Sequence, residues 1–145
     1  MGYFRQALPP PSPTDEDEPF WCHVRQGRLH FQCCEECKTF SHPPTLHCPA
    51  CGSSQRIWKP ASSRGVLFSY TVVHRASHPS VRDDTPYNVV LVAFPECGDV
   101  RLVTNAVGLR AHELRIGMEL EVFIDGEGGS AVPRVRCPGE LGPSS

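Results

Sequence analysis

The sequence predicts a mainly β protein in which an N-terminal helix and a zinc ribbon precede a five-stranded OB-fold barrel. Two observations carry this prediction. Two Cys-x2-Cys pairs, separated by ten residues, lie within the first 51 residues of the chain. From residue 65 onward, five segments with strand-like patterning are separated by turn signals. Five strands, with a short interruption between the third and the fourth, are typical of the OB-fold.

The two cysteine pairs predict a closed metal site. Its expected ligands are the four paired cysteines, Cys34, Cys37, Cys48 and Cys51. A gap of two residues lets one tight turn aim both sulfur atoms of a pair at the same ion, and four thiolates suit a tetrahedral structural zinc site with Zn–S distances of about 2.3 Å. Gly52 follows the second pair and accepts the positive φ that such turns often require, whereas Lys38 holds the matching position after the first pair.

Other ligand sets for this site stay open at the level of the sequence. Cys33 precedes Cys34 and could replace it, and His42 and His47 lie between the two pairs. A site of three cysteines and one histidine is therefore conceivable. Iron could also occupy the same four sulfur atoms in place of zinc.

The elements before the barrel follow in chain order. Residues 1–19 contain five prolines and an acidic run, so we expect a flexible tail. Residues 20–26 favour a short helix with apolar residues on one side and Gly27 as its end. Strands are expected at Leu29–Gln32, which leads into the first cysteine pair, and at Ile57–Lys59, which returns from the second.

Five strands and one helical turn are expected in the barrel. The strands are Gly65–Arg75, Asn88–Phe94, Val100–Val107, Glu119–Ile124 and Val132–Arg136. The segment 109–116 has room for one helical turn between the third and the fourth strand. The predicted organisation is a flexible tail over 1–19, the helix and zinc ribbon over 20–62, the OB-fold over 63–137 and a second flexible tail over 138–145.

The patterning also predicts which strand faces are buried. The first strand alternates, and this places four residues on one face, Val66, Phe68, Tyr70 and Val72. The segment 88–94 is almost continuously apolar, which predicts burial on both faces, one toward the barrel interior and one toward a second layer. In the fourth strand Leu120, Val122 and Ile124 are expected to point inward.

Composition narrows the class of protein. The chain has 145 residues, eight cysteines and a formal charge of -2. Its first residues lack the apolar core of a secretion signal, and four cysteines have metal-binding spacing, so we expect a reducing cytoplasm rather than a secreted disulfide framework. No apolar stretch approaches the roughly 20 residues of a membrane-spanning helix. The balance of charge disfavours nucleic-acid binding.

The order of several short motifs along the chain resembles that of a known family. These motifs are Pro19-Phe20-Trp21, Gly27-x-Leu29, Cys34-x2-Cys37, Pro43-Pro44, Cys48-Pro49-x-Cys51-Gly52, Ser69-Tyr70-Thr71-Val72-Val73, Pro86-Tyr87 and Ile116-Gly117-Met118. In this order they resemble the thiolase-associated zinc-ribbon and OB-fold proteins, domain-of-unknown-function family thirty-five. The resemblance extends over residues 19–137 and implies a rubredoxin-like zinc ribbon.

The resemblance also implies a role. Members of that family are small subunits that bind thiolases, sterol-carrier-type aldolases or related acyltransferases and help to form the acyl-CoA site. We therefore expect a hetero-oligomer in which this chain holds structural Zn²⁺ and contacts a coenzyme A thioester, while the catalytic groups belong to the partner. The residues themselves agree, because no catalytic motif such as Gly-x-Ser-x-Gly, a Walker loop or His-Glu-x-x-His is present.

Six residues are candidates for contacts with the coenzyme A thioester. They are Tyr70, His74, Arg75, Tyr87, Arg134 and Arg136. Tyrosines can stack or hydrogen-bond, a histidine can contact phosphate, and the guanidinium fork of arginine suits phosphate. The alternative for all six residues is an ordinary position in the core or on the solvent-exposed surface, without contact to a ligand. The alternative function is a single-stranded nucleic-acid binder, which both OB-folds and zinc ribbons can be.

Overall fold

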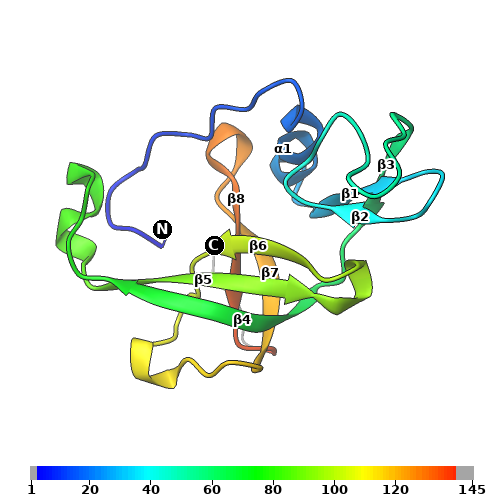
Figure 1. Cartoon of the computed structure of the whole chain (residues 1–145). Coiled ribbons are helices and arrows are strands. Elements are labelled where there is room, and N and C mark those ends of the chain that lie inside the picture. The colour runs from blue at the N-terminus through cyan, green and yellow to red at the C-terminus, as the bar shows by residue number, and fades with distance from the viewer. Residues whose placement is uncertain (1–2, 140–145) are drawn as a thin grey trace.

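The computed structural model describes residues 3–139 and shows, in that part, one α-helix, a small three-stranded sheet and a curled five-stranded sheet (Figure 1). The small sheet has the strand order β2-β1-β3 and the large sheet the order β6-β5-β4-β7-β8. All pairs of neighbouring strands are antiparallel. The predicted fold class, a helix and a zinc-ribbon region followed by an OB-fold, is confirmed.

The helix α1, Glu18–Arg25, begins two residues earlier than predicted. Pro19 lies in its first turn, where the missing N–H would have no helical partner anyway. Its end is the predicted one, since Gly27 has φ of 78° and donates its N–H to the carbonyl of Val24 at 2.9 Å. At eight residues, α1 is the longest helix of the described part and too short to cross a bilayer.

The ribbon consists of β1 (His30–Cys34), β2 (Phe40–Ser41) and β3 (Arg56–Pro60). The predicted pairing of an entering and a returning strand is present, because β1 and β3 pair over their whole lengths. The strand β2 was not predicted, since a two-residue strand carries no periodic pattern. It follows the first cysteine pair and pairs with β1 through Cys33 and Gln32.

The barrel strands agree closely with the predicted segments. They are β4 (Arg64–Val73), β5 (Tyr87–Phe94), β6 (Val100–Thr104), β7 (Glu119–Asp125) and β8 (Val132–Arg136). Short 3-10 helices lie between them at η1 (Pro79–Asp84), η2 (Pro95–Cys97), η3 (Ala111–Glu113) and η4 (Gly128–Ser130). The predicted helical turn between the third and fourth strands corresponds to η3.

The predicted face of β4 is wrong, because the strand is bulged. Val66 pairs with Ala93, but after a shift of register between Leu67 and Ser69, Tyr70 pairs with Val90. Paired residues share a face and β5 is regular, so Val66 and Tyr70 point to opposite sides of the sheet. The core residue of this strand is the fully buried Leu67, whereas Phe68 is 46% exposed.

The prediction for β5 holds on its inner face and in part on its outer face. Alternate residues from Asn88 to Phe94 are buried against the barrel interior. Tyr87, Val89 and Leu91 on the other face are half-buried. The inward residues of β7 are as predicted, with Leu120 fully buried and Val122 and Ile124 packed against the core.

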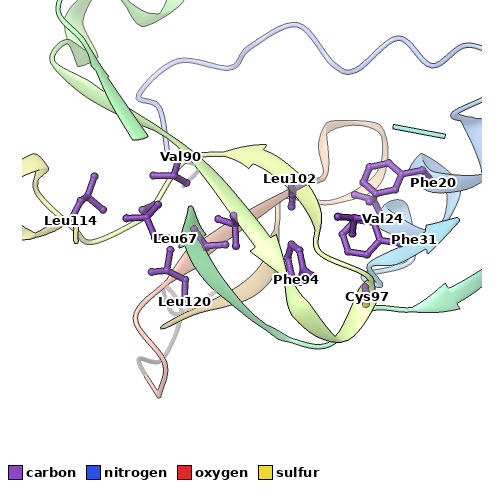
Figure 2. Close-up of a cluster of buried hydrophobic side chains, with 14 of the residues drawn as sticks. Phe20, Val24, Phe31, Leu67, Val90, Phe94, Cys97, Leu102, Leu114 and Leu120 are labelled. Atoms are coloured by element: carbon purple, nitrogen blue, oxygen red, sulfur yellow. The ribbon is translucent and has the colours of Figure 1, made fainter. Parts of the chain in front are cut away.

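One hydrophobic core joins the ribbon, the helix and the barrel. Figure 2 shows Phe20, Val24 and Phe31 beside the barrel residue Phe94. The rings of Phe31 and Phe94 meet edge to face, with 5.1 Å between their centroids. Both rings are fully buried. The ribbon is therefore packed into the barrel core rather than attached to it by a linker.

The predicted N-terminal tail makes specific contacts with the barrel in its first described residues. Phe4 is buried, and its ring meets that of Tyr87 perpendicularly at 5.1 Å. From there the chain crosses to α1 as an extended segment (Figure 1). Most of the predicted C-terminal tail lies outside the described residues.

Candidate metal centre and apolar groove

The four predicted cysteines converge at the tip of the ribbon. Their sulfur atoms all lie within 4.8 Å of one another. The Sγ atoms of Cys34 and Cys51 are 3.6 Å apart, and those of Cys37 and Cys48 are 3.5 Å apart. A tetrahedral zinc ion with Zn–S bonds of about 2.3 Å requires sulfur atoms about 3.8 Å apart, so this arrangement fits the ion.

The two cysteine turns have the same backbone construction. The N–H of Lys38 donates to the carbonyl of Cys34 at 3.0 Å, and the N–H of Gly52 donates to the carbonyl of Cys48 at 2.9 Å. Lys38 has φ of 64° and Gly52 has φ of 79°. The left-handed position predicted from Gly52 therefore exists in both turns, and a lysine adopts it in the first one.

Backbone N–H groups favour the thiolate form of two of these sulfur atoms, those of Cys48 and Cys34. The N–H of Cys51, and next that of Ala50, lower the pKa of the Cys48 thiol to about 6. The N–H of Cys37 lowers the pKa of the Cys34 thiol in the same way. Thiolates are the form in which cysteine binds a metal, so Cys34 and Cys48 are favoured as ligands. At Cys51 the backbone hydrogen bond of Ser53 lowers the pKa, but hydrogen bonds with the other three thiols, that of Cys34 first, outweigh it and raise the pKa to about 12.

The alternative ligands are not part of the cluster. Cys33 adjoins Cys34 on strand β1, where neighbouring side chains point to opposite faces, and it is buried in the interior. The ring of His42 lies between those of Phe20 and Phe31, at 4.9 and 5.2 Å. The described residues that group as metal ligands are the four cysteines of the two pairs.

The second feature is a groove of about 760 Å³ over the outer face of the large sheet. Its floor is the outer face of β5 and β6, with Val89, Leu91 and Val103. One wall comes from Trp21 of α1 and the loop 43–44 of the ribbon, and the other from the N-terminal segment. The lining is mostly apolar, and its volume lies in the range of small-molecule sites.

Comparison with solved structures identifies the family. A chain in the solved structure of the Ltp2-ChsH2(DUF35) aldolase is similar to this one, with a TM-score of 0.78 and 34% sequence identity. The similarity covers 88% of this chain and 98% of that chain. The chain belongs to the ChsH2 (DUF35) family. The resemblance inferred from the sequence motifs is thereby confirmed.

Two family models match successive parts of this ChsH2-family chain. Residues 21–55 match the ChsH2 rubredoxin-like zinc ribbon domain, and residues 58–125 match the ChsH2 C-terminal OB-fold domain. A DUF35-family protein of unknown function from Sulfolobus solfataricus has the same fold, with a TM-score of 0.61 at 17% identity over 85% of both chains.

A curated relative is much longer than this chain. It is the "Probable enoyl-CoA hydratase alpha subunit" of Thermomonospora curvata, which is 40% identical over 114 residues. The match covers 78% of this ChsH2-family chain but 34% of the relative. The chain thus spans about a third of the length of that relative.

The six residues predicted to contact a coenzyme A thioester do not form one site. Tyr87 and Arg134 reach the groove. Tyr70 is exposed on β4, and His74 and Arg75 are exposed beyond the end of that strand. Their contact with a ligand stays a prediction.

The two arginines of β8 are engaged with the protein itself. The Nε atom of Arg134 donates to Asp125 at 2.9 Å, and its guanidinium also reaches Asn105. The Nε atom of Arg136 donates to Glu121 at 3.2 Å, and its guanidinium lies over the ring of Phe123, 4.5 Å from the centroid. These contacts explain both positions without a ligand.

Most groove residues were missed from the sequence. Phe4 and Leu8 lie in the segment predicted to be a flexible tail, and Pro43-Pro44 was recognised only as one of the family motifs. The sequence did contain a signal for Phe4, because burying an aromatic ring is favourable even when the surrounding segment is polar and proline-rich. The position of its partner Tyr87, 83 residues later, has no local signal.

Ion pairs neutralise much of the arginine charge in the described residues. Each of five arginines pairs with a carboxylate, namely Arg5 with Asp84, Arg25 with Glu18, Arg64 with Glu119, Arg134 with Asp125 and Arg136 with Glu121. Arg101 instead stacks on the ring of Phe68, 3.6 Å from its centroid. Nucleic-acid backbones bind arrays of unpaired cations, so this pattern favours other partners.

Proposed function

We propose that this chain is a non-catalytic, zinc-binding subunit of a thiolase-like or aldolase-like complex. In it, the chain helps to bind and orient an acyl-CoA substrate for the active site of its partner. The observation that carries the proposal is the similarity, over nearly the whole of both chains, to a component of the Ltp2-ChsH2(DUF35) aldolase. The hydratase subunit that shares 40% identity also acts, by its name, on a coenzyme A thioester.

In this proposal the metal is structural. Cys34, Cys37, Cys48 and Cys51 hold Zn²⁺, and all four positions of a tetrahedral ion are then filled by protein. The ion supplies a cross-link between the two cysteine turns. The cross-link stabilises β1, which in turn packs Phe31 against the barrel.

The barrel and the groove would serve the substrate. An apolar groove of this size can hold the acyl part of a thioester, and orientation of a bound substrate lowers a reaction barrier without chemistry from the orienting chain. The proposal also includes domain boundaries near residues 19, 62 and 137, a hetero-oligomeric state and a location in the reducing cytoplasm. The reacting groups belong to the partner.

The test is reconstitution with a partner. Thiolase-fold and sterol-carrier-type aldolase proteins from the same genome are co-expressed with the tagged chain, and complexes are identified by size-exclusion chromatography with light scattering. We expect one of them to form a stable hetero-oligomer. Its catalytic efficiency on an acyl-CoA substrate should rise at least about ten-fold when the chain is present, a gain that orientation can supply.

Two controls interpret this experiment. The isolated chain is assayed alone and should turn over no substrate. The metal-loaded chain is compared with a chain from which zinc has been removed by a chelator, which should no longer support the partner. A partner that is fully active without the chain would contradict the proposal.

A further inference from the structure

Strand β6 forms one edge of the large sheet and lies beside the groove (Figure 1). Four consecutive residues of this strand, 101–104, line the groove. Neighbouring side chains of a strand point to opposite faces of the sheet, so an opening over one face alone would meet every second residue. The groove therefore meets the edge of β6 as well as its outer face.

Hydrogen bonds at the end of β6 fix the direction of the backbone groups along this edge. The carbonyl of Asn88 accepts from the Asn105 side chain, so Asn88 and its alternates on β5 face β6, at residues 104, 102 and 100. Asn105 directs its own carbonyl away from β5, where it accepts from the N–H of Val135. Alternate residues of an antiparallel strand turn both their N–H and C=O groups to the same side. Arg101 and Val103 therefore direct theirs away from β5 as well.

These outward groups have no backbone partner in the part of the chain that the structure describes. No backbone hydrogen bond reaches Arg101 or Val103 from outside β5. Contact of this edge with β8 begins only at Asn105 and Ala106. Val103 is also 66% exposed, although it lies in the middle of a strand. The edge thus presents the N–H and C=O groups of two residues together with an apolar side chain.

The other described edges of the two sheets are protected against strand addition. Strand β8 contains Pro133, β3 contains Lys59 and Pro60, and β2 is two residues long. Prolines, lysines and short length are the usual means of blunting an edge. Strand β6 has neither proline nor lysine, and its charged side chain, Arg101, lies over the ring of Phe68 on β4. Its edge therefore lacks these forms of protection.

We infer that the edge of β6 accepts a short extended segment of the partner protein as a sixth strand of the large sheet. That a partner exists rests on the proposed function, whereas the place and the mode of binding rest on the edge. Main-chain hydrogen bonds to Arg101 and Val103 hold the segment, as in other cases of β-augmentation. The added strand lies in the sheet, about 4.8 Å beyond β6, so it extends the floor of the groove rather than filling the groove.

The lining of the groove indicates the chemistry of this segment. Side chains on the same face as Val103 and Leu91 meet an apolar surface, which favours β-branched or aromatic residues. Of the two arginines in the lining, Arg134 pairs with Asp125, whereas Arg101 pairs with no carboxylate in the described residues. We expect a carboxylate of the partner segment beside Arg101.

Amide hydrogen exchange, followed by NMR on the isotope-labelled chain, reports this edge residue by residue. In the isolated chain the N–H groups of Arg101 and Val103 should exchange at least about 100-fold faster than those of Leu102 and Thr104, which face β5. In the complex obtained by reconstitution, the two fast amides should become protected. A complex in which they stay fast would overturn the inference and leave the proposed function intact.

Val103→Pro tests the edge by removing its outward N–H. Because that N–H faces away from β5, the variant keeps the ladder between β5 and β6, and an edge strand tolerates proline at such a position. It should weaken binding of the partner about ten-fold or more, measured by biolayer interferometry, while the Leu102 and Thr104 amides stay protected. Val103→Thr keeps both the N–H and the β-branched shape, so as the matched control it should change the affinity by less than about three-fold.

Equal binding by Val103→Pro and the unaltered chain would also contradict strand addition. If Val103→Pro loses the protection of Leu102 and Thr104, the variant is misfolded and the exchange comparison on the unaltered chain decides instead.

Overlapping short peptides from the same candidate partners distinguish this inference from the proposed function when no complex forms. A peptide that binds the isolated chain, protects the Arg101 and Val103 amides and binds Val103→Pro more weakly would support strand addition without a functional complex. The absence of any such peptide, together with the absence of a complex, would overturn both.

Discussion

At the scale of single residues, His42 shows how the ribbon and the helix depend on a neutral side chain. Its ring lies between Phe20 and Phe31, and its Nδ1 atom is buried without a hydrogen-bond partner. Burial lowers the pKa of His42 to about 4. The ring must therefore stay uncharged in the folded chain at neutral pH.

This residue predicts acid sensitivity of the fold. The pKa of His42 is about 4 when folded and about 6.5 when unfolded, so the unfolded chain binds more protons between these values and stability falls as pH falls through that window. Between pH 7 and pH 5 we expect a loss of about 2 kcal/mol in the free energy of unfolding from this group. Urea titrations at the two pH values, with zinc in excess, measure it.

The variant His42→Leu isolates the effect. It should reduce the pH dependence by about the same 2 kcal/mol, whatever its effect on stability at pH 7. His23 and His30, whose rings stack at 3.8 Å, also have pKa values lowered by burial and keep their share of the slope in both chains. An unchanged slope in His42→Leu would show that the ring is accessible to protons in the folded state.

At the scale of elements, strand β4 packs closely against β5 at Gly65, which has no side chain. A Cβ atom at Gly65 would lie 2.5 Å from the Cγ1 atom of Val92 and 3.0 Å from the carbonyl oxygen of Ala93. Strand β5 can therefore cross β4 closely only because Gly65 has no side chain there. Its partner on the other neighbouring strand is the fully buried Leu120.

Gly65→Ala should destabilise the barrel. The new methyl group overlaps a buried valine and a backbone carbonyl that cannot move freely, and such overpacking costs about 1–3 kcal/mol of unfolding free energy. Gly129→Ala is the matched control, since no atom lies within 4 Å of its Cβ position and the expected change is within about 0.5 kcal/mol. Chemical denaturation of both variants measures their free energies of unfolding. Equal stabilities would mean that β4 and β5 can separate locally at no cost.

At the scale of the whole molecule, the shared core couples the metal site to the stability of the barrel. The ligand Cys34 ends the same strand that carries Phe31, and Phe31 packs against Phe94 of β5. Loss of the metal would free the tip of β1 and, through Phe31, loosen the barrel. The molecule should therefore unfold as one cooperative unit.

Cys48→Ser should remove the metal and destabilise both parts. We expect zinc content to fall from about one ion per chain to near zero, and the melting temperature to fall by about 10 °C or more. Mass spectrometry of bound metal and hydrogen exchange of the β5 amides provide the two measurements. Cys22→Ser, at an exposed position on α1, should change neither. A zinc-free chain whose β5 amides stay protected would instead make the ribbon an independent unit.

Spacing and alternation along the chain were sufficient to predict the cysteine cluster and every described strand except the two-residue β2. A two-residue gap confines a pair of sulfurs to one turn, and a period of two residues reflects one buried face, so both signals are local. The bulge after Leu67 escaped prediction because the register of β4 depends on β5, not on its own residues. The groove was equally invisible, since its lining residue Phe4 meets Tyr87 across 83 positions of chain. Such contacts arise only when the barrel, the helix and the ribbon have packed around one core.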